Sequence, residues 1–435
     1  MFNYRNIFIK KKILIYGLGK SGISVLTFFK KEKDIYLYDD KIINTKFKKK
    51  KNFLKYKTLI KKNFDHIIIS PGINISTCKL KNYLKKNLNK IHTDLDIFYT
   101  KFNQNKIITV TGTNGKSTTV KILYEILRAQ KMDARLVGNI GNPVLLEKNI
   151  KESTIFIIEA SSYQLEYSKI FKSNISVILN ISPDHLERHK SLDKYIDSKF
   201  KLIKNQTKND YAVLNTKNIY IENKIKNNNF LSKIVKIKKN ISRPILNKIN
   251  NPYFMTKGNK ENLSFVLEIA KILKIKKKIV LKTVNSFEGL KYRQQIIYRS
   301  KKLTIINDSK ATSFSSSTSI LSSLSNVYWI VGGLAKKGDK LLLSKNKCKN
   351  FKAYIFGKNN NLLINSLKGL INYESFINLE VLLKKIFFDI KNSKNQNHKT
   401  ILFSPAAASF DSFKNFEHRG KYFNNLVMKF RNVKR

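Results

Sequence analysis

Short apolar runs alternate with amphipathic stretches along most of the chain. Apolar runs that predict strands occupy 13–16, 35–38, 66–70, 106–111, 154–158, 175–179, 303–306, 328–331, 354–356 and 400–403. Stretches with helical periodicity lie at 21–29, 120–127, 192–203 and about 262–273. This alternation predicts an α/β protein with mostly parallel sheets, whose ligands bind at the carboxyl ends of the strands.

The strands fall into three groups, so we expect three domains, at 1–102, 103–293 and 294–435. The Lys- and Asn-rich segment 204–260 has weak periodicity, and we interpret it as strands and loops at the rim of the second domain. No internal repeat and no Gly/Ser-rich linker separates the groups. Compact domains are therefore expected, rather than domains on flexible tethers.

The charge balance raises the question of a nucleic-acid partner. Lys and Arg number 85 against 29 Asp and Glu, a net charge of +56. The lysines run from Lys10 to Lys434 through every segment, together with abundant Ile and Asn, which favours compositional drift on solvated faces over a binding surface. A basic nucleic-acid-binding protein stays as the non-enzyme alternative, distinguished by stacking aromatics among the basic residues of one face.

The cysteine content and the hydropathy of the chain indicate in which cellular compartment the protein lies. The chain has only Cys78 and Cys348, too few for a disulfide framework and without zinc-site spacing. No run approaches the roughly 18 apolar residues of a membrane helix, and the apolar run at 13–16 ends at a glycine turn, unlike a signal peptide. We expect a soluble cytoplasmic protein with no membrane partner.

The strongest local signal is TGTNGKST, residues 111–118, between a buried-type strand and a helical stretch. Backbone N–H groups in a glycine turn at a helix N-terminus bind phosphate, and the helix dipole adds to this. Lys116 would reach the outer phosphates, and the Ser117 hydroxyl suits Mg²⁺. Val110 stands where the strict pattern has glycine, so this is a shortened P-loop.

A second glycine turn, GLGKSG at 17–22, also follows a strand, and Asp39 lies 20 residues beyond Gly19. Taken alone this fits a nicotinamide dehydrogenase. A hydride-transferring enzyme has no need of the triphosphate site in the next domain. Both turns are compatible with a first domain that holds another diphosphate, such as that of a UDP-sugar.

Three single residues are candidates for metal binding or catalysis. Glu159 ends an apolar strand, where a carboxylate can hold Mg²⁺ opposite the P-loop or simply cap a helix. His185, in NISPDH, could bind metal or stabilise charge, although a lone histidine is usually structural. Lys199 lies on a helical stretch, and its spacing does not distinguish it from the other solvated lysines.

Two polar clusters follow strands near the C-terminus. NDSKAT, 307–312, gathers an acid, a base and two hydroxyls, and SPAAASFDSFKNFEHRG, 404–420, follows the last strand. Strand ends are where ligands bind in open α/β sheets, so the clusters suggest a second substrate site. Each by itself also fits a capping or turn role.

Taken in order, these motifs resemble the Mur ligases over nearly the whole chain. The shared segments are GLGKSG at Gly17, SPG at Ser70, TGTNGKST at Thr111, GNIG at Gly138, EASSYQLE at Glu159, PDHLERH at Pro183, FEGLKYR at Phe287, NDSKAT at Asn307, GGLAKKGD at Gly332 and the long motif at Ser404. GTNGK is common to Mur ligases and folylpolyglutamate synthases. NDSKAT and the Ser404 motif indicate the branch that adds D-glutamate.

The resemblance implies a fold and a reaction. The fold is a Rossmann-like UDP-binding domain, a central P-loop ATPase and a C-terminal Rossmann-like α/β domain that receives the amino acid. The reaction is the ATP-dependent joining of D-glutamate to UDP-N-acetylmuramoyl-L-alanine through an acyl phosphate, in bacterial peptidoglycan precursor synthesis. It implies Mg²⁺ at two sites, a CO₂-derived carbamate on Lys199 and no nucleic acid. We expect a monomer.

The resemblance also assigns roles to residues at matching positions. ATP would be bound by Gly112, Thr113, Asn114, Gly115, Lys116, Ser117, Thr118, Asn259, Arg293 and Asp308. The UDP substrate would meet Gly19, Lys20, Ser21, Asp39, Asp40, Ser70, Gly72 and Asn139. D-glutamate would meet Lys310, Thr312, Lys336, Ser409 and Phe416. Lys116, Glu159, His185 and Lys199 would be catalytic, and the metal ligands would be Ser117, Glu159, His185 and carbamylated Lys199.

The sequence departs from the family pattern at three points. The adenine-side histidine before Asn259 is missing, the usual His-Arg pair is Tyr292-Arg293, and Lys336 is chosen over Lys337 by register alone. Another Mur ligase step and a folylpolyglutamate synthase-like ligase remain alternatives. The second of these should lack both the N-terminal glycine turn and the Ser404 motif.

Overall fold

The computed structural model describes residues 7–41, 47, 50–237, 241–335, 338–357, 360–393 and 396–432. These residues form three sheets in two compact units, and the predicted α/β class is confirmed. The first unit consists of the chain up to Asn240 together with Ser264–Thr283, and the second of Ile241–Leu263 together with the chain from Val284 onward. None of the helices formed by the described residues is both long and apolar enough to cross a membrane.

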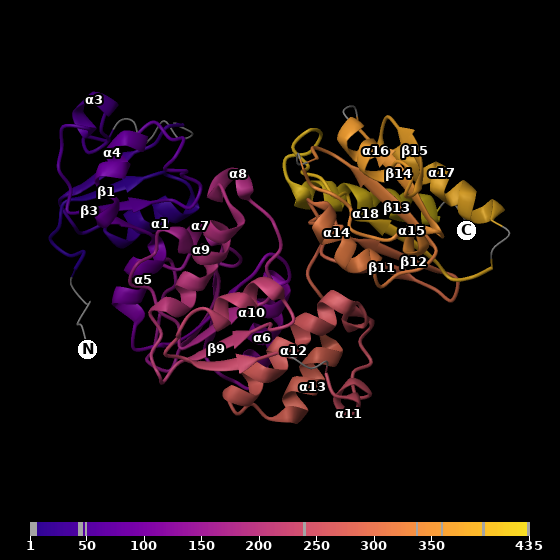
Figure 1. Cartoon of the computed structure of the whole chain (residues 1–435), viewed down its shortest axis with the longest axis horizontal. Coiled ribbons are helices and arrows are strands. Elements are labelled where there is room, and N and C mark those ends of the chain that lie inside the picture. The colour runs from indigo at the N-terminus through magenta and orange to yellow at the C-terminus, as the bar shows by residue number, and fades with distance from the viewer. Residues whose placement is uncertain are drawn as a thin grey trace. The chain divides into compact units, whose positions relative to one another are not determined.

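The first sheet lies at the N-terminal end of the first unit, drawn in indigo in Figure 1. Its strand order is β2-β1-β3-β4, and all its pairs are parallel. Alternate residues of β1 face opposite layers: Ile13 packs with α1 and α5, whereas Leu14 packs with the side of α3 and α4. The elements are β1 (Ile13–Tyr16), α1 (Lys20–Phe28), β2 (Ile35–Tyr38), α3 (Tyr56–Leu59), β3 (His66–Ile69), α4 (Lys81–Lys86), η2 (Leu88–Lys90), β4 (Ile91–His92) and α5 (Asp94–Phe102).

The second sheet of this unit is also parallel throughout, in the order β10-β9-β8-β5-β7-β6. Its elements are β5 (Lys106–Thr111), α6 (Lys116–Ala129), β6 (Ala134–Gly138), β7 (Ile155–Glu159), α7 (Ser162–Glu166), β8 (Ile175–Ile178), α8 (Leu186–His189), α9 (Leu192–Lys204), β9 (Tyr211–Leu214), α10 (Ile219–Lys226) and β10 (Lys233–Lys236). Helix α6 packs on one face and α9 on the other, because their apolar stripes meet opposite sides of the strands. The central strands β5, β7 and β8 end beside the start of α6, so their last residues can form one site.

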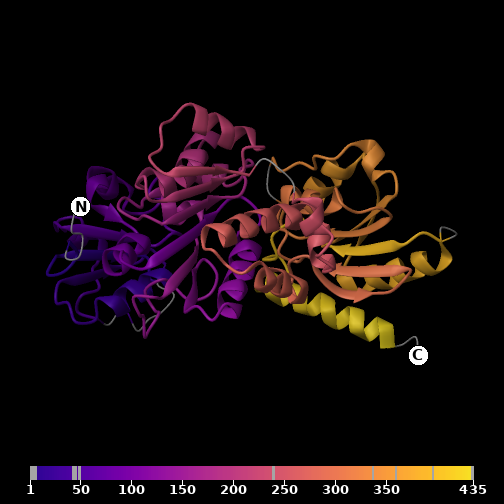
Figure 2. The same cartoon turned by 90° about the horizontal axis from the view of Figure 1, so that it is seen from below.

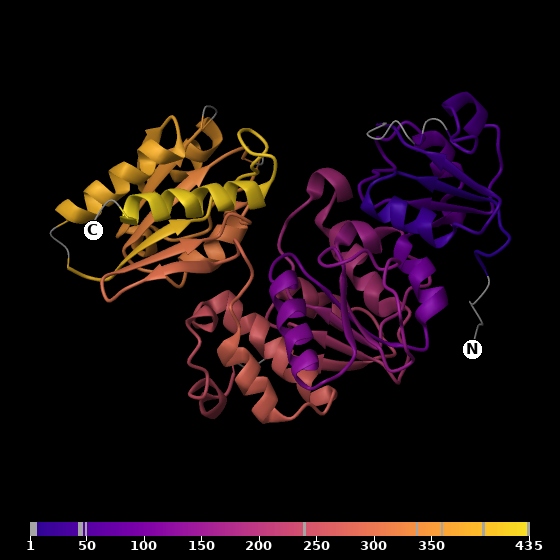
Figure 3. The ribbon, with the colours of Figure 1, turned by 180° about the vertical axis from the view of Figure 1, so that it is seen from behind.

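The second unit contains the third sheet, ordered β11-β12-β16-β13-β14-β15, in which only β11 is antiparallel. Helices α14, α15 and α16 pack on one face, and α17 and α18 on the other; Figures 2 and 3 show α18 running along its side of the sheet. The elements are α11 (Arg243–Leu246), η3 (Pro252–Met255), β11 (Gln295–Arg299), β12 (Leu303–Asn307), α14 (Phe314–Leu321), β13 (Val327–Gly332), α15 (Lys345–Cys348), β14 (Phe351–Phe356), α16 (Asn361–Leu367), β15 (Asn372–Phe376), α17 (Leu379–Asn392), β16 (Lys399–Phe403) and α18 (Phe416–Asn432). Helices α12 (Lys257–Ile272) and α13 (Lys277–Ser286) are shared between the two units.

The structure corrects some of the predicted elements. The helix predicted near Asn262 begins at Lys257, and the P-loop helix begins at Lys116 rather than Val120. Segment 204–260, predicted as strands and loops, also contains α10 and α11. The three-domain division with boundaries after residues 102 and 293 stays a prediction.

Candidate active site

The loop between β5 and α6 is shaped by its own glycines and by the end of β8. Gly115, with φ 86°, caps α6 in the left-handed region, where a side chain would be strained. Asn180, just after β8, accepts a hydrogen bond from the Asn114 backbone N–H over 2.8 Å and donates to the Asn114 carbonyl over 3.2 Å. The loop is thus held in place from a neighbouring strand end, which leaves the N-terminus of α6 oriented for an anionic ligand.

Two lysines meet at the carbonyl oxygen of Gly112. Lys116 Nζ donates to this oxygen over 2.8 Å, and Lys199 Nζ donates to it over 3.0 Å. Lys199 is 1% exposed and lies 4.5 Å from the centroid of the Tyr195 ring. Burial, and next the charge of Lys116, hold the pKa of Lys199 well below its usual value.

A buried acid lies on the other side of the loop. Glu159, the last residue of β7, accepts a hydrogen bond from Ser117 Oγ over 2.6 Å and another from Asn139 Nδ2 over 2.9 Å. Glu159 and Ser117 are each 2% exposed. A hydroxyl and a carboxylate in contact are oxygen donors of the kind that Mg²⁺ binds.

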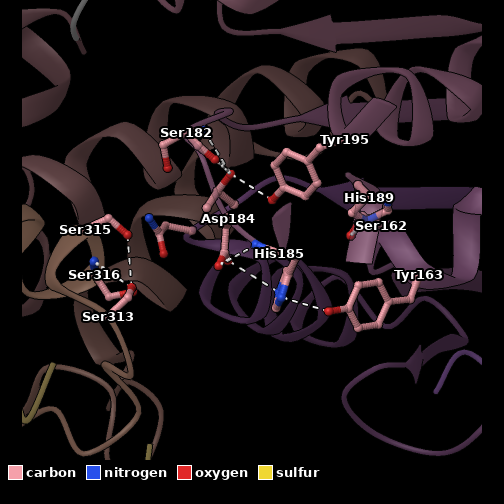
Figure 4. Close-up of polar contacts among 12 residues, drawn as sticks. Ser162, Tyr163, Ser182, Asp184, His185, His189, Tyr195, Ser313, Ser315 and Ser316 are labelled. Atoms are coloured by element: carbon pink, nitrogen blue, oxygen red, sulfur yellow. Dashed lines mark hydrogen bonds and ion pairs between the residues drawn. The ribbon is translucent and has the colours of Figure 1, made fainter. Parts of the chain in front are cut away.

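His185 lies beside this cluster with its ring held on both sides (Figure 4). Its Nδ1 is 2.9 Å from the hydroxyl of Tyr163, on α7, and its Nε2 is 3.4 Å from Asp184 Oδ2. Its backbone is left-handed, with φ 55° and ψ 30°. The charge of Asp184 also acts on Lys199, where it opposes the lowering of the pKa. The structure therefore brings the predicted residues around the P-loop into one site.

A second group of predicted residues surrounds the first glycine turn. Asp39 accepts hydrogen bonds from the backbone N–H of Leu18 and of Lys41, over 2.6 and 2.8 Å, and so holds the loop itself. Asp40 accepts from the Tyr16 hydroxyl over 2.7 Å, and Ser70 Oγ donates to the Gly17 carbonyl over 2.6 Å. The other residues assigned to this site lie on the same loops: Gly19 caps α1, Lys20 and Ser21 begin it, and Gly72 follows β3.

The nucleotide-side residues predicted in the second unit are joined by Gln294. Asn259 Nδ2 donates to Gln294 Oε1 over 3.1 Å, and the Gln294 backbone N–H donates to Asp308 Oδ1 over 3.1 Å. Burial raises the pKa of Asp308 to about 7, although nearby Arg293 opposes the shift. A cavity of about 240 Å³ has Asn259 and Gln294 in its wall.

The two C-terminal motifs also meet. Lys310 Nζ lies 4.3 Å from the centroid of the Phe416 ring, and Ser309 Oγ donates to the Phe416 carbonyl over 2.9 Å. Ser409 is buried and Thr312 is half-buried in the same loops. Lys336, assigned to the same amino-acid site, lies outside the described residues.

Comparison with known proteins decides the family. The model for the Mur ligase middle domain matches residues 110–286, and the model for the MurD-like N-terminal domain of Mur ligases matches residues 11–92. A protein of Rickettsia felis named UDP-N-acetylmuramoylalanine–D-glutamate ligase is 34% identical, over 96% of this chain and 97% of its own. A protein of Francisella tularensis with the same name is 32% identical, over 96% of this chain and 95% of its own.

The chain belongs to the Mur ligase family. The resemblance seen in the motifs is confirmed. Solved structures of Mur ligases share the fold: MurC of Thermotoga maritima has a TM-score of 0.56 at 16% identity, covering 97% of this chain and 100% of its own. MurF of Thermotoga maritima, in complex with ADP, has a TM-score of 0.57 at 14% identity, covering 99% of this chain and 97% of its own.

In each unit of this Mur ligase, the structure adds a residue that no motif indicated. The Tyr195 hydroxyl is 3.1 Å from Thr113 Oγ1, and the face of its ring lies against Nζ of Lys199, one helical turn further along α9. The i, i+4 spacing of Tyr195 and Lys199, within a stripe that includes Phe200 and Ile203, was a signal that Lys199 is buried. Arg419 is fully buried and donates to the carbonyls of Ser309, Gly332 and Ala407, at the ends of three strands. Nothing in its spacing predicted those partners.

Proposed function

We propose that this Mur ligase joins D-glutamate to UDP-N-acetylmuramoyl-L-alanine at the cost of ATP, as a step in peptidoglycan precursor synthesis. The observation that carries the proposal is the similarity, over 96% of the chain, to relatives named for that ligation. The buried P-loop with Lys116, Ser117 and Glu159 supports the use of ATP. The paired loops at Lys310 and Phe416 support an amino-acid site.

The first chemical step is phosphoryl transfer. A carboxylate oxygen of the alanine attacks the γ-phosphorus of ATP, the bond to the bridging oxygen breaks, and ADP leaves with that electron pair. This transfer needs positioning and charge neutralisation more than covalent help from the protein. Lys116 supplies a positive charge, and the amides at the start of α6 supply hydrogen bonds to the phosphates.

The second step forms the amide. The amine of D-glutamate attacks the acyl carbon, the tetrahedral intermediate collapses with loss of phosphate, and the amine gives up a proton. Lysines and hydroxyls suit a substrate with two carboxylates, so we assign its binding to Lys310, Thr312, Ser409 and Phe416, with Lys336.

Mg²⁺ fits the donor set of the first unit. Ser117 and Glu159 would hold one ion, and bound Mg²⁺ would neutralise phosphate charge there. Among the described residues, no three or more His, Cys, Asp or Glu side chains gather in a metal-binding group, so a second site beside His185 needs another oxygen donor. A carbamate on Lys199 would supply it, since the neutral amine is the form that takes up CO₂ and burial lowers the pKa of Lys199 toward that form.

The remaining assignments complete the proposal. The first glycine turn, with Asp39, Asp40 and Ser70, would take the UDP part, and the cavity at Asn259 would take part of the ATP. The proposal keeps the three domains, 1–102, 103–293 and 294–435, and a cytoplasmic monomer that binds no nucleic acid. Light scattering of the purified protein and a DNA-binding titration at physiological salt test the last two points.

A phosphate-release assay tests the function. The protein, ATP and Mg²⁺ are mixed with UDP-N-acetylmuramoyl-L-alanine and, in turn, with D-glutamate, L-glutamate, L-lysine, diaminopimelate and L-alanine. We expect D-glutamate to be the preferred acceptor, and no amide product when the UDP substrate is left out. Preference for L-lysine, diaminopimelate or L-alanine would assign the chain to another step of the pathway.

A further inference from the structure

Tyr163 is placed against His185 by the short helix that follows the strand of Glu159. Helix α7 begins at Ser162, and Ser161 caps it, since its side chain accepts a hydrogen bond from the Gln164 backbone N–H. Tyr163 is the second residue of this helix, and its hydroxyl is 2.9 Å from His185 Nδ1. The two rings lie 4.9 Å apart at 57°, with the side chains pointing toward one another (Figure 4).

Tyr163 is itself fixed by a charged pair. The guanidinium carbon of Arg188 lies 4.8 Å from the centroid of the Tyr163 ring. Arg188 is held by Glu166, whose Oε2 is 3.0 Å from both Nε and Nη2 of the guanidinium. A ring packed against a held cation has little freedom, so the hydroxyl of Tyr163 is directed at one place.

His185 is constrained at three points. Its backbone adopts the left-handed conformation, which is uncommon for a residue with a side chain. Its Nδ1 meets the Tyr163 hydroxyl, with Glu187 Oε1 further away at 3.5 Å. Its Nε2 is directed to Asp184, the acid whose charge acts on Lys199. With Nδ1 bonded to Tyr163, Nε2 is the ring nitrogen that faces Asp184.

We propose that Tyr163 is a positioning residue for His185. Its hydroxyl engages Nδ1 and so presents Nε2 on the Asp184 side, in the same way that outer hydrogen-bond partners orient functional histidines. The ring of Tyr163 packs in the half-buried site with or without the hydroxyl, so the hydroxyl is the group that carries this role. The effect on ligation rests on the proposed function, whereas the effect on the His185 ring does not.

The test is a nuclear magnetic resonance measurement of the ring nitrogens in protein labelled at its six histidines. The His185 signals are assigned by their absence in His185→Gln. We expect Tyr163→Phe to shift the His185 ring-nitrogen signals, while Tyr167→Phe leaves them in place. Tyr167 is the matched control because it lies in the same segment and its ring also meets Arg188, at 5.9 Å. Unchanged His185 signals in Tyr163→Phe, with unchanged thermal unfolding, would overturn the proposal.

A double-mutant cycle tests whether Tyr163 acts through His185 in the ligation reaction. Tyr163→Phe should lower kcat by about 10-fold, with the KM for ATP little changed, because an outer partner of a functional histidine is lost. In a His185→Gln background the same substitution should have no further effect, since the two residues act as one unit. An equal loss in both backgrounds would overturn the coupling. If the wild-type protein does not ligate D-glutamate while Tyr163→Phe still shifts the His185 signals, the proposed function is contradicted. The positioning of His185 by Tyr163 then still stands.

Discussion

Lys116 and Lys199 donate hydrogen bonds to the same carbonyl oxygen, that of Gly112, over 2.8 and 3.0 Å. Two ammonium groups that share one acceptor repel each other, and the repulsion is large where water is excluded. Burial is the larger cause that holds the pKa of Lys199 well below its usual value, and the charge of Lys116 lowers this pKa further. The buried amine of Lys199 therefore gives up its proton more readily than the amine of an exposed lysine.

Replacing Lys116 with alanine should reduce ligation by at least about 100-fold, because a charge positioned at the transferring phosphates is lost. The far-ultraviolet circular dichroism should be unchanged. Lys121→Ala is the matched control, since Lys121 lies on the same helix and pairs with Glu125 over 3.2 Å. Turnover of Lys116→Ala near the wild-type rate would refute the P-loop assignment.

Lys199→Ala should lose activity and regain part of it when a short carboxylate such as acetate is added. An added carboxylate replaces the oxygen donor that a carbamate would provide. Exposed Lys194, on the same helix, is the control, and its alanine variant should show neither the loss nor the rescue. Full activity of Lys199→Ala without acetate would contradict the carbamate and would mean that Lys199 only packs in the core.

Asn139 holds Glu159 by a hydrogen bond of 2.9 Å, although the family resemblance assigns it to the substrate. Asn139→Ala should therefore raise the Mg²⁺ concentration for half-maximal activity, by about 10-fold or more, as loss of an outer partner of a metal ligand does. Asn142→Ala, in the same loop but bonded to Glu147, should not. A change confined to the KM of the UDP substrate would instead support the substrate contact.

Ser409→Ala should weaken the use of D-glutamate with little change in the KM for ATP. A lost hydrogen bond to a charged group costs about 1.5–3 kcal/mol, or roughly a 10- to 150-fold fall in kcat/KM for the amino acid. Exposed Ser412, on the same loop, is the control. Equal losses for ATP and D-glutamate would point to a disturbed fold, which thermal unfolding would reveal.

Asp308 should make the protein less stable as the pH rises. Its pKa is raised to about 7 by burial, from 3.8, so the folded state keeps the proton over a range where the unfolded state has released it. Stability contributed by this group therefore falls between about pH 4 and about pH 7 and is level above that. Urea unfolding at about pH 5 and about pH 8 should show a larger loss in wild type than in Asp308→Asn. Exposed Asp411→Asn should behave as wild type.

Motifs with fixed spacing were predictable because their partners are local. The P-loop needs a strand, a glycine turn and a helix in consecutive residues, and the structure has β5, Gly115 and α6 in that order. The strand at Ile35–Tyr38 and the one at Lys106–Thr111 have the predicted bounds, since a buried parallel strand is rich in apolar and β-branched residues. Segment 204–260 was misjudged because its many lysines and asparagines obscure the helical periodicity of α10.

The sequence by itself determined the α/β class, most of the strands and the two glycine turns, all of which depend on neighbouring residues. The spacing of Tyr195 and Lys199 places Lys199 on the apolar stripe of α9, but only the tertiary structure showed that its amine reaches the Gly112 carbonyl, because that contact arises where α9 packs against the loop that ends at Lys116. The same holds for Tyr163 and His185, 22 residues apart, and for Arg419 and Ser309, 110 apart. Such residues can form hydrogen bonds because the ends of different strands lie side by side in the folded sheet. The spacing of residues along the chain does not predict which strand ends become neighbours.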